Sequence, residues 1–257
     1  MNLSLQADLA TGYRSGLQVA RILTEHWVGG EAYCTNCGYH PLQQFANNNR
    51  TGDFHCPSCL ERYELKSQRT RFGAKVIDGA YQTMLDRLAS ANNPNLFLLN
   101  YDVGAWRVSN FIVIPKHFVT PSIIEKKNPL PPSARRAGWI GCRILLDAIP
   151  QSGHIFLVEN HSVRQKQEVL EEWRKTLFLR DQKNFSAKGW LLNVMRCIDR
   201  IGRPTFSLAD VYAFEAELRD AYPGNKNIRA KIRQKLQALR DNGYLIFLGN
   251  GMYRLAG

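Results

Sequence analysis

Two sets of residues that can bind metal ions occupy one short segment of the sequence. Four cysteines form two C-x2-C pairs, and Asp53 stands between the pairs, with ten residues separating it from Glu64-Leu65-Lys66. Four thiolates can hold a zinc ion tetrahedrally, whereas Mg²⁺ prefers oxygen ligands. Together the two patterns predict enzymatic cutting of nucleic acid. The cysteines are Cys34, Cys37, Cys56 and Cys59.

The acidic residues have the types and spacing of a metal-dependent phosphodiesterase. Such an enzyme needs a metal ion that polarises the phosphate and activates water. Asp53 and Glu64 supply two carboxylates if neighbouring strands bring them together, and the Leu65 carbonyl is a further possible Mg²⁺ ligand. Alternation along a strand puts Lys66 on the same face as Glu64, where it can orient the attacking water. The alternative is that this short pattern has arisen by chance from surface charges.

The paired cysteines favour a structural rather than a catalytic zinc site, because four protein ligands leave no open coordination position. The alternative is four unpaired buried thiols. Cys142 and Cys197 lie elsewhere in the sequence and are expected to be small apolar core residues. This cysteine usage fits a reducing cytoplasm better than a secreted disulfide framework.

Composition indicates a globular protein with a polyanionic partner. The chain has 257 residues, 44% of them hydrophobic, and a formal net charge of +12. That length suggests one large or two ordinary domains, and the charge favours binding to nucleic acid. The first twenty residues lack an apolar core and the longest apolar runs are too short to cross a bilayer. We therefore expect a cytoplasmic protein without a signal peptide or membrane contact.

Residues 1–183 have the pattern of an α/β domain. A helix is predicted over 14–28, ended by Gly29-Gly30, and a strand over 62–67. The strongest amphipathic pattern in the chain predicts a helix from Ile77 to Leu88. Three more strands are predicted, and this order of elements implies a mixed sheet covered by helices. These strands span 96–101, 107–114 and 154–159.

Residues 184–257 have the order of a winged-helix domain. Helices are predicted over 187–201, from a cap at Ser207, and over 225–242, followed by a hairpin turning at Gly249-Asn250-Gly251. The segment holds 12 Lys and Arg against 6 Asp and Glu, which fits a third helix lying in a DNA groove. Candidate DNA-contacting residues on that helix are Lys226, Asn227, Arg229 and Arg233.

The segment 133–139 is a second candidate for DNA recognition. It follows several prolines and contains Arg135, Arg136 and Trp139. Paired arginines suit phosphates or guanine edges, and a tryptophan can pack on an apolar feature of a base. The alternative is a solvated arginine pair beside a core tryptophan.

Taken together, these residues resemble the DpnI family of restriction endonucleases, which cut adenine-methylated GATC. The resemblance runs nearly end to end and is carried by several stretches besides the cysteine pairs. These are the RILTE sequence from Arg21, ELKS from Glu64, DGAY from Asp78, RRAGWIGC from Arg135, IFLV from Ile155 and KIRQ from Lys231.

The resemblance implies a PD-(D/E)xK catalytic domain and a winged helix that each read the methylated site. It implies that Asp53, Glu64 and Lys66 are the catalytic positions, that the four cysteines bind zinc, and that Trp139 belongs to a methyl-sensing loop. In GATC the two N6-methyl groups are close together in the major groove, so one aromatic group could contact both. Gly52 precedes Asp53 where the motif name suggests proline, a position that varies among such nucleases.

Our interpretation is a Mg²⁺-dependent type II endonuclease that cleaves double-stranded DNA methylated at adenine N6 within GATC. We expect a monomer without an obligate protein partner, although whether cleavage requires two copies is open. One alternative is a non-catalytic reader or transcription regulator built from the same cysteines and winged helix. Another is a nuclease of the same fold with a different specificity.

Overall fold

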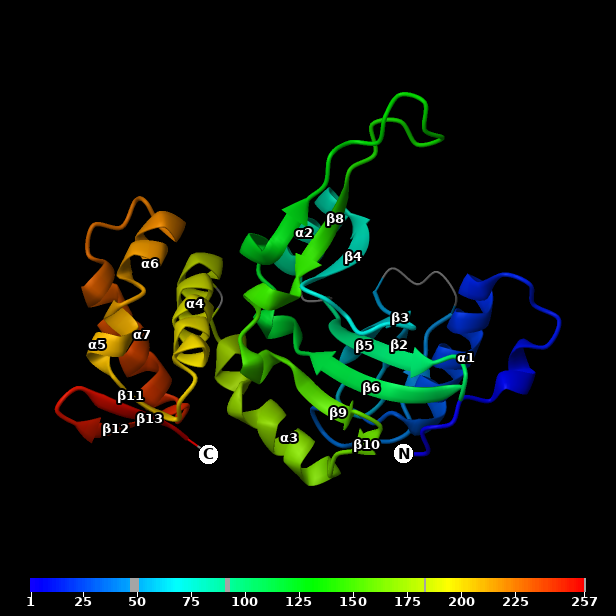
Figure 1. Cartoon of the computed structure of the whole chain (residues 1–257), viewed down its shortest axis with the longest axis horizontal. Coiled ribbons are helices and arrows are strands. Elements are labelled where there is room, and N and C mark those ends of the chain that lie inside the picture. Colours follow the sequence, from blue (N-terminus) through cyan, green and yellow to red (C-terminus); the bar gives the residue numbers. More distant parts are fainter. Residues whose placement is uncertain (47–50, 91–92, 183, 257) are drawn as a thin grey trace. The chain divides into compact units, whose positions relative to one another are not determined.

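The computed structural model describes residues 1–46, 51–90, 93–182 and 184–256 and divides the chain into two compact units (Figure 1). The first unit comprises Met1–Leu146 and Ser152–Arg174, and the second Asp147–Gln151 and Lys175–Gly257. Lys183, the last residue of the expected first domain, lies outside the described residues. No helix in the described ranges has both the length and the apolar character needed to cross a membrane.

The first unit is built on a seven-stranded mixed sheet in the order β1-β2-β3-β5-β6-β9-β10. Only β3 and β5 pair in parallel, and all the other pairs of this sheet are antiparallel. A parallel pair needs a long crossover connection, which β4 and α2 provide here. The strands are β1 (Gln43–Gln44), β2 (Phe54–His55), β3 (Arg62–Gln68), β5 (Asn95–Asp102), β6 (Arg107–Ile114), β9 (Ile155–Glu159) and β10 (Ser162–Val163).

An aromatic cluster forms the core between this sheet and helix α1 (Gly16–Glu31). The ring of Trp27 packs edge-on against Phe111, with 5.2 Å between centroids. Phe97 lies 4.7 Å from Phe111 and stacks on Tyr63 at 4.3 Å. Buried aromatic pairs of this kind contribute about 0.5–1.5 kcal/mol each beyond the area they bury. The core therefore anchors β3, the strand that carries Glu64 and Lys66.

Helix α1 confirms the first predicted helix but extends further than expected. It continues through Gly29 and Gly30 to Glu31, so the prediction that the glycine pair ends it was wrong. Val28 is fully buried and the side chain of Trp27 donates a hydrogen bond to the Asn2 carbonyl. Tertiary packing of these neighbours outweighs the low helix propensity of two glycines.

A second, three-stranded antiparallel sheet has the order β4-β8-β7. Here the predicted amphipathic helix from Ile77 is only half correct. Residues before Tyr81 form strand β4, which pairs with β8, and Ile77 is 66% exposed. Strand pairing thus overrides a local helical pattern. The elements are β4 (Lys75–Ala80), α2 (Tyr81–Ala89), β7 (Ile124–Lys126) and β8 (Gly141–Leu145).

One further helix lies almost entirely in the first unit, and short helical turns occur in both units. Helix α3 (Lys166–Lys175) buries Val169, Leu170 and Trp173. The indole of Trp173 donates a hydrogen bond to Asn36 in the first cysteine loop. The 3₁₀ turns are η1 (Ala7–Ala10), η2 (Lys116–Phe118), η3 (Pro121–Ile123), η4 (Leu146–Ala148), η5 (Gln151–Gly153) and η6 (Leu177–Arg180).

The second unit confirms the winged-helix prediction. Asn184 caps its first helix, and Ser207 forms a capping box with Asp210 at the next. Ile232 and Leu236 are fully buried on the predicted inner face of the third helix. A three-stranded sheet in the order β11-β13-β12 closes the fold. The elements are α4 (Phe185–Ile201), β11 (Thr205–Ser207), α5 (Leu208–Tyr212), α6 (Glu215–Ala221), α7 (Ile228–Asp241), β12 (Leu245–Gly249) and β13 (Met252–Leu255).

Candidate active site, cysteine cluster and DNA-binding domain

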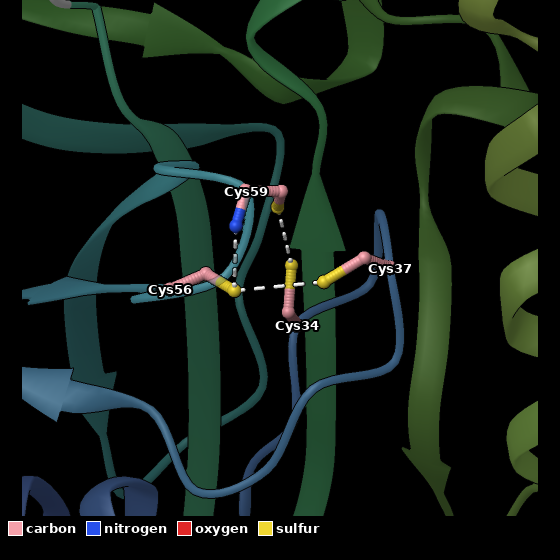
Figure 2. A group of neighbouring side chains, drawn as sticks. All are labelled: Cys34, Cys37, Cys56 and Cys59. Carbon is pink, nitrogen blue, oxygen red and sulfur yellow. Dashed lines mark hydrogen bonds between the residues drawn. The ribbon is translucent and has the colours of Figure 1, made fainter.

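The four cysteines converge on one point in the first unit (Figure 2). Their sulfur atoms all lie within 4.8 Å of one another. Cys34 Sγ is 3.4 Å from Cys59 Sγ, and Cys37 Sγ is 3.5 Å from Cys56 Sγ. Tetrahedral coordination at the usual Zn–S distance of about 2.3 Å separates sulfur atoms by a little under 4 Å. The donors therefore fit a four-coordinate structural zinc ion.

Backbone hydrogen bonds shape each C-x2-C pair into a knuckle. In the first, the Gly38 amide donates to the Cys34 carbonyl at 2.7 Å; in the second, the Leu60 amide donates to the Cys56 carbonyl at 2.9 Å. Gly38 and Leu60 both have positive φ angles, which turn the chain back after each pair. The local geometry that orients the sulfur atoms is thus formed by the protein itself.

Tyr63 links the cysteine cluster to the strand of the acidic site. Its hydroxyl lies 3.2 Å from Cys34 Sγ and accepts a hydrogen bond from the Thr35 amide. Burial raises the pKa of the Tyr63 phenol well above its usual value, so the group stays protonated. Because Glu64 follows directly in β3, the cluster and the acidic site are joined through adjacent residues of one strand.

Asp53 enters the candidate active site from the residue before β2. Its amide donates to the Tyr63 carbonyl at 2.8 Å, and its Oδ2 accepts a hydrogen bond from the Leu65 amide at 2.7 Å. Burial raises the pKa of Asp53, and the nearby charges of Glu64 and Glu25 add to this effect. A raised carboxyl pKa means that the negative charge is incompletely balanced, a condition that a bound cation would relieve.

Glu64 and Lys66 lie on the same face of β3, as strand alternation predicts. Lys66 Nζ is 2.6 Å from Glu64 Oε1 and 2.9 Å from Asp78 Oδ1. The other carboxylate oxygen of Glu64 is 2.6 Å from Arg87 Nη2. Burial alone would lower the pKa of Lys66, but the two carboxylates outweigh burial and raise it well above its usual range. Lys66 is therefore a fixed cation at neutral pH.

Three charged residues near this site were not found from the sequence. The negative charge of Glu25 on α1 raises the pKa of Asp53. Asp78 on β4 forms an ion pair with Lys66, and Arg87 on α2 forms one with Glu64. Asp78 belongs to the DGAY stretch used for the family resemblance, but its partner Lys66 is twelve residues away on another sheet. Among the described residues, the only set of three or more His, Cys, Asp or Glu side chains close enough to share a metal ion is the cysteine cluster.

The 133–139 segment lies in a long loop between β7 and β8 that extends away from the sheets of the first unit (Figure 1). Its base is held by hydrogen bonds from the Leu130 amide to the Trp139 carbonyl and from the Lys127 amide to the Gly141 carbonyl. Arg135 and Arg136 are exposed, and Trp139 is half-buried. A Cβ on Gly141 would lie 2.8 Å from the Trp139 ring, so the indole rests on the backbone at the start of β8.

The four candidate residues predicted on the third helix of the winged domain differ in position and in their contacts within the chain. Lys226 and Asn227 are exposed just before α7. Arg229 is bound by Glu215 at 2.6 Å and lies over the Tyr212 ring, and Arg233 donates a hydrogen bond to the Tyr212 hydroxyl. The two arginines thus have intramolecular partners that any DNA phosphate would compete with.

Comparison with protein families agrees with this architecture along nearly the whole chain. Residues 1–182 match the family described as DpnI, the Dam-replacing family. Residues 186–255 match the family described as the Dam-replacing HTH domain. The protein is thus a mixed α/β domain with a four-cysteine cluster, joined to a helix-turn-helix DNA-binding domain. It belongs to the DpnI, Dam-replacing family, which confirms the resemblance noted in the sequence.

Proposed function

We propose that this protein is a Mg²⁺-dependent type II restriction endonuclease that cleaves double-stranded DNA at GATC sites methylated at adenine N6. Family membership supports an endonuclease, and the helix-turn-helix domain supports a DNA substrate. The observation that carries the catalytic assignment is the arrangement on β3. Lys66 Nζ lies 2.6 Å from Glu64, while Asp53 is joined to the same strand through the Leu65 amide.

Asp53 and Glu64 are the residues that would hold Mg²⁺, with the Leu65 carbonyl as a third ligand. They offer the hard oxygen donors that Mg²⁺ prefers, and the raised pKa of Asp53 fits a group that a cation stabilises. Bound there, the ion would polarise the scissile phosphate and lower the pKa of a water molecule. Catalytic Mg²⁺ is distinct from the structural Zn²⁺ that we assign to the cysteine cluster.

The chain's own groups would position the reactants. Lys66 carries a fixed positive charge beside Glu64, where it orients the attacking water and offsets the charge that develops on the phosphate. The bond from the Leu65 amide keeps the Asp53 carboxylate at a set position relative to β3. The zinc-bound knuckles hold this strand through Tyr63.

We assign recognition of the methylated site to both domains. The boundary between the two domains is placed near residues 183–184. In the first domain, exposed Arg135 and Arg136 would contact DNA, and Trp139 would sense the two methyl groups. In the second, Lys226 and Asn227 would approach the DNA from just before α7, and Arg229 and Arg233 from α7 itself. The exposed arginines on an extended loop and the basic winged domain support this division.

The test is digestion of one plasmid, prepared with and without adenine methylation at GATC, with Mg²⁺ and without a divalent ion. Discrete fragments only from methylated DNA with Mg²⁺ are expected. Asp53→Ala should abolish cleavage while retaining binding to a methylated duplex, and exposed Asp8→Ala is the matched control. Cleavage of both plasmids would overturn the methyl dependence, and binding without any cleavage by the unmodified protein would favour a non-catalytic reader.

A further inference from the structure

A chain of four charged groups crosses the candidate active site from one sheet to the other. Asp78 Oδ1 lies 2.9 Å from Lys66 Nζ, and that ammonium lies 2.6 Å from Glu64 Oε1. Glu64 Oε2 in turn lies 2.6 Å from Arg87 Nη2. Lys66 is therefore shared between two carboxylates, and only one of them belongs to the sequence motif.

Asp78 is the most enclosed member of this chain. Its side chain is 6% exposed, against 24% for Lys66 and 18% for Glu64. Glu64, Asp78 and Arg87 also line one small cavity of about 20 Å³, which is room for roughly one water molecule. A carboxylate buried this far is costly unless it is paired, and Lys66 is the cation that pairs with it.

The backbone of β4 is irregular at the point where it presents Asp78. Asp78 pairs with Cys142 on β8, but the next paired residue is Ala80 with Gly141, so Gly79 is an extra residue in the ladder. Bulges of this type redirect side chains and are frequent beside active sites. The bulge thus lies immediately beside the residue that reaches across to β3.

Glu64 has a cation on each carboxylate oxygen, so a metal ion binding there competes with Lys66 and Arg87 for the charge of this carboxylate. If Lys66 had Glu64 as its sole anionic partner, the metal would have to compete for the whole ion pair. With Asp78 also in contact, Lys66 keeps one carboxylate when it gives up the other. It then stays beside the metal instead of turning towards solvent.

We propose that Asp78 is a positioning residue, which holds Lys66 in the active site when Glu64 turns from Lys66 to the metal ion. This inference rests on the proposed function, since it requires a divalent ion at Asp53 and Glu64. It predicts that Asp78 affects metal binding through Lys66, and not merely through its own negative charge.

The test is a double-mutant cycle on metal affinity, which needs no cleavage. Mn²⁺ binding to the full-length zinc-loaded protein is measured by calorimetry for the unmodified chain, Asp78→Asn, Lys66→Met and the double variant. Asp78→Asn should weaken Mn²⁺ binding about tenfold when Lys66 is present and have little effect in Lys66→Met, in line with coupling between contacting residues. Asp78→Glu, which keeps the charge, should recover most of the affinity.

An equal loss of affinity in both backgrounds would show that Asp78 acts only as a distant charge, and no loss in either would also overturn the proposal. Asp53→Ala serves as the site control. If that variant binds Mn²⁺ as well as the unmodified chain, the metal site assigned to Asp53 is wrong, independently of Asp78. Thermal unfolding checks each variant, and Asp78→Ser takes the place of Asp78→Asn in the same cycle if the asparagine variant does not fold.

Discussion

The Tyr63 carbonyl lies 2.9 Å from the position that a Cβ atom on Gly52 would occupy. The same carbonyl accepts the hydrogen bond from the Asp53 amide. Gly52 also has a φ angle of +140°, which L side chains rarely adopt. The departure from proline before Asp53 therefore has a physical cause: this approach of two backbones, which sets the position of Asp53, excludes any side chain at residue 52.

Replacing Gly52 with alanine should destabilise the protein. A side chain at this φ angle costs about 1–3 kcal/mol, and the contact with the Tyr63 carbonyl adds to it. Gly30→Ala is the matched control, because Gly30 lies in α1 with nothing within 4 Å of its added Cβ. That change should be neutral or stabilise by about 0.5–1 kcal/mol. Denaturant unfolding of both variants measures the difference, and equal stabilities would contradict the steric argument.

Removing one ligand of the cysteine cluster should release the metal and loosen β3. Cys34→Ser is expected to lose zinc, measured as metal content per chain, and to lower the unfolding temperature. Tyr63 would then lose its sulfur contact beside Glu64. Cys142→Ser is the control, since Cys142 lies outside the cluster and its hydroxyl replacement can still donate to the Gly79 carbonyl. One zinc per chain retained by Cys34→Ser with unchanged zinc affinity would contradict the assignment of Cys34 as a ligand.

Asp53→Asn should stabilise the protein at neutral pH when no divalent ion is added. Burial raises the pKa of Asp53 in the folded state, so the folded protein binds this proton more tightly than the unfolded chain does. The cost of the ionised group is full above the raised pKa and disappears as pH falls below about 3.9, the ordinary value. The stability difference between Asp53→Asn and the unmodified chain should therefore shrink on acidification. A difference that grows at low pH would contradict a raised pKa.

Trp139 and its neighbouring arginines should contribute differently to DNA binding. Trp139→Ala should reduce the preference for methylated over unmethylated duplex, by about 1–3 kcal/mol if methyl contact resembles other single changes at a base edge. Arg136→Ala should weaken binding to both duplexes. If Arg136 contacts a phosphate, the slope of the logarithm of the binding constant against the logarithm of the salt concentration should decrease by about one. Equilibrium binding at several salt concentrations separates the two effects. An unchanged methyl preference in Trp139→Ala would remove the indole from methyl recognition.

In the winged domain, Lys226→Ala should weaken DNA binding more than Arg229→Ala does. Lys226 is exposed before α7, whereas Arg229 is already paired with Glu215 at 2.6 Å. A paired arginine adds less net positive potential, and a phosphate must first displace its carboxylate partner. The salt dependence of binding for the two variants provides the measurement, and a larger loss in Arg229→Ala would reverse the ranking.

The sequence by itself determined the local features of this protein. Two C-x2-C pairs with the spacing of metal ligands predicted the cluster that the structure brings together. Period-two alternation predicted that Glu64 and Lys66 share a face of β3. Apolar residues at helical spacing predicted the inner face of α7, and the structure buries them. The shared face of β3 and the inner face of α7 depend on residues a few positions apart, where backbone geometry alone fixes which side chains lie together. The two cysteine pairs meet across 19 to 25 residues, and only their ligand spacing, not backbone geometry, predicted that they would do so.

The tertiary structure decided which distant residues join these local features. It turned the residues before Tyr81 into a strand, because β8 pairs with them, and so brought Asp78 to Lys66. It brought Arg87 into an ion pair with Glu64. It also placed the Tyr63 carbonyl so close to residue 52 that only glycine fits there without a shift of the backbone. No short-range pattern encodes these contacts, since they arise from the register of strands and the packing of separate sheets and helices.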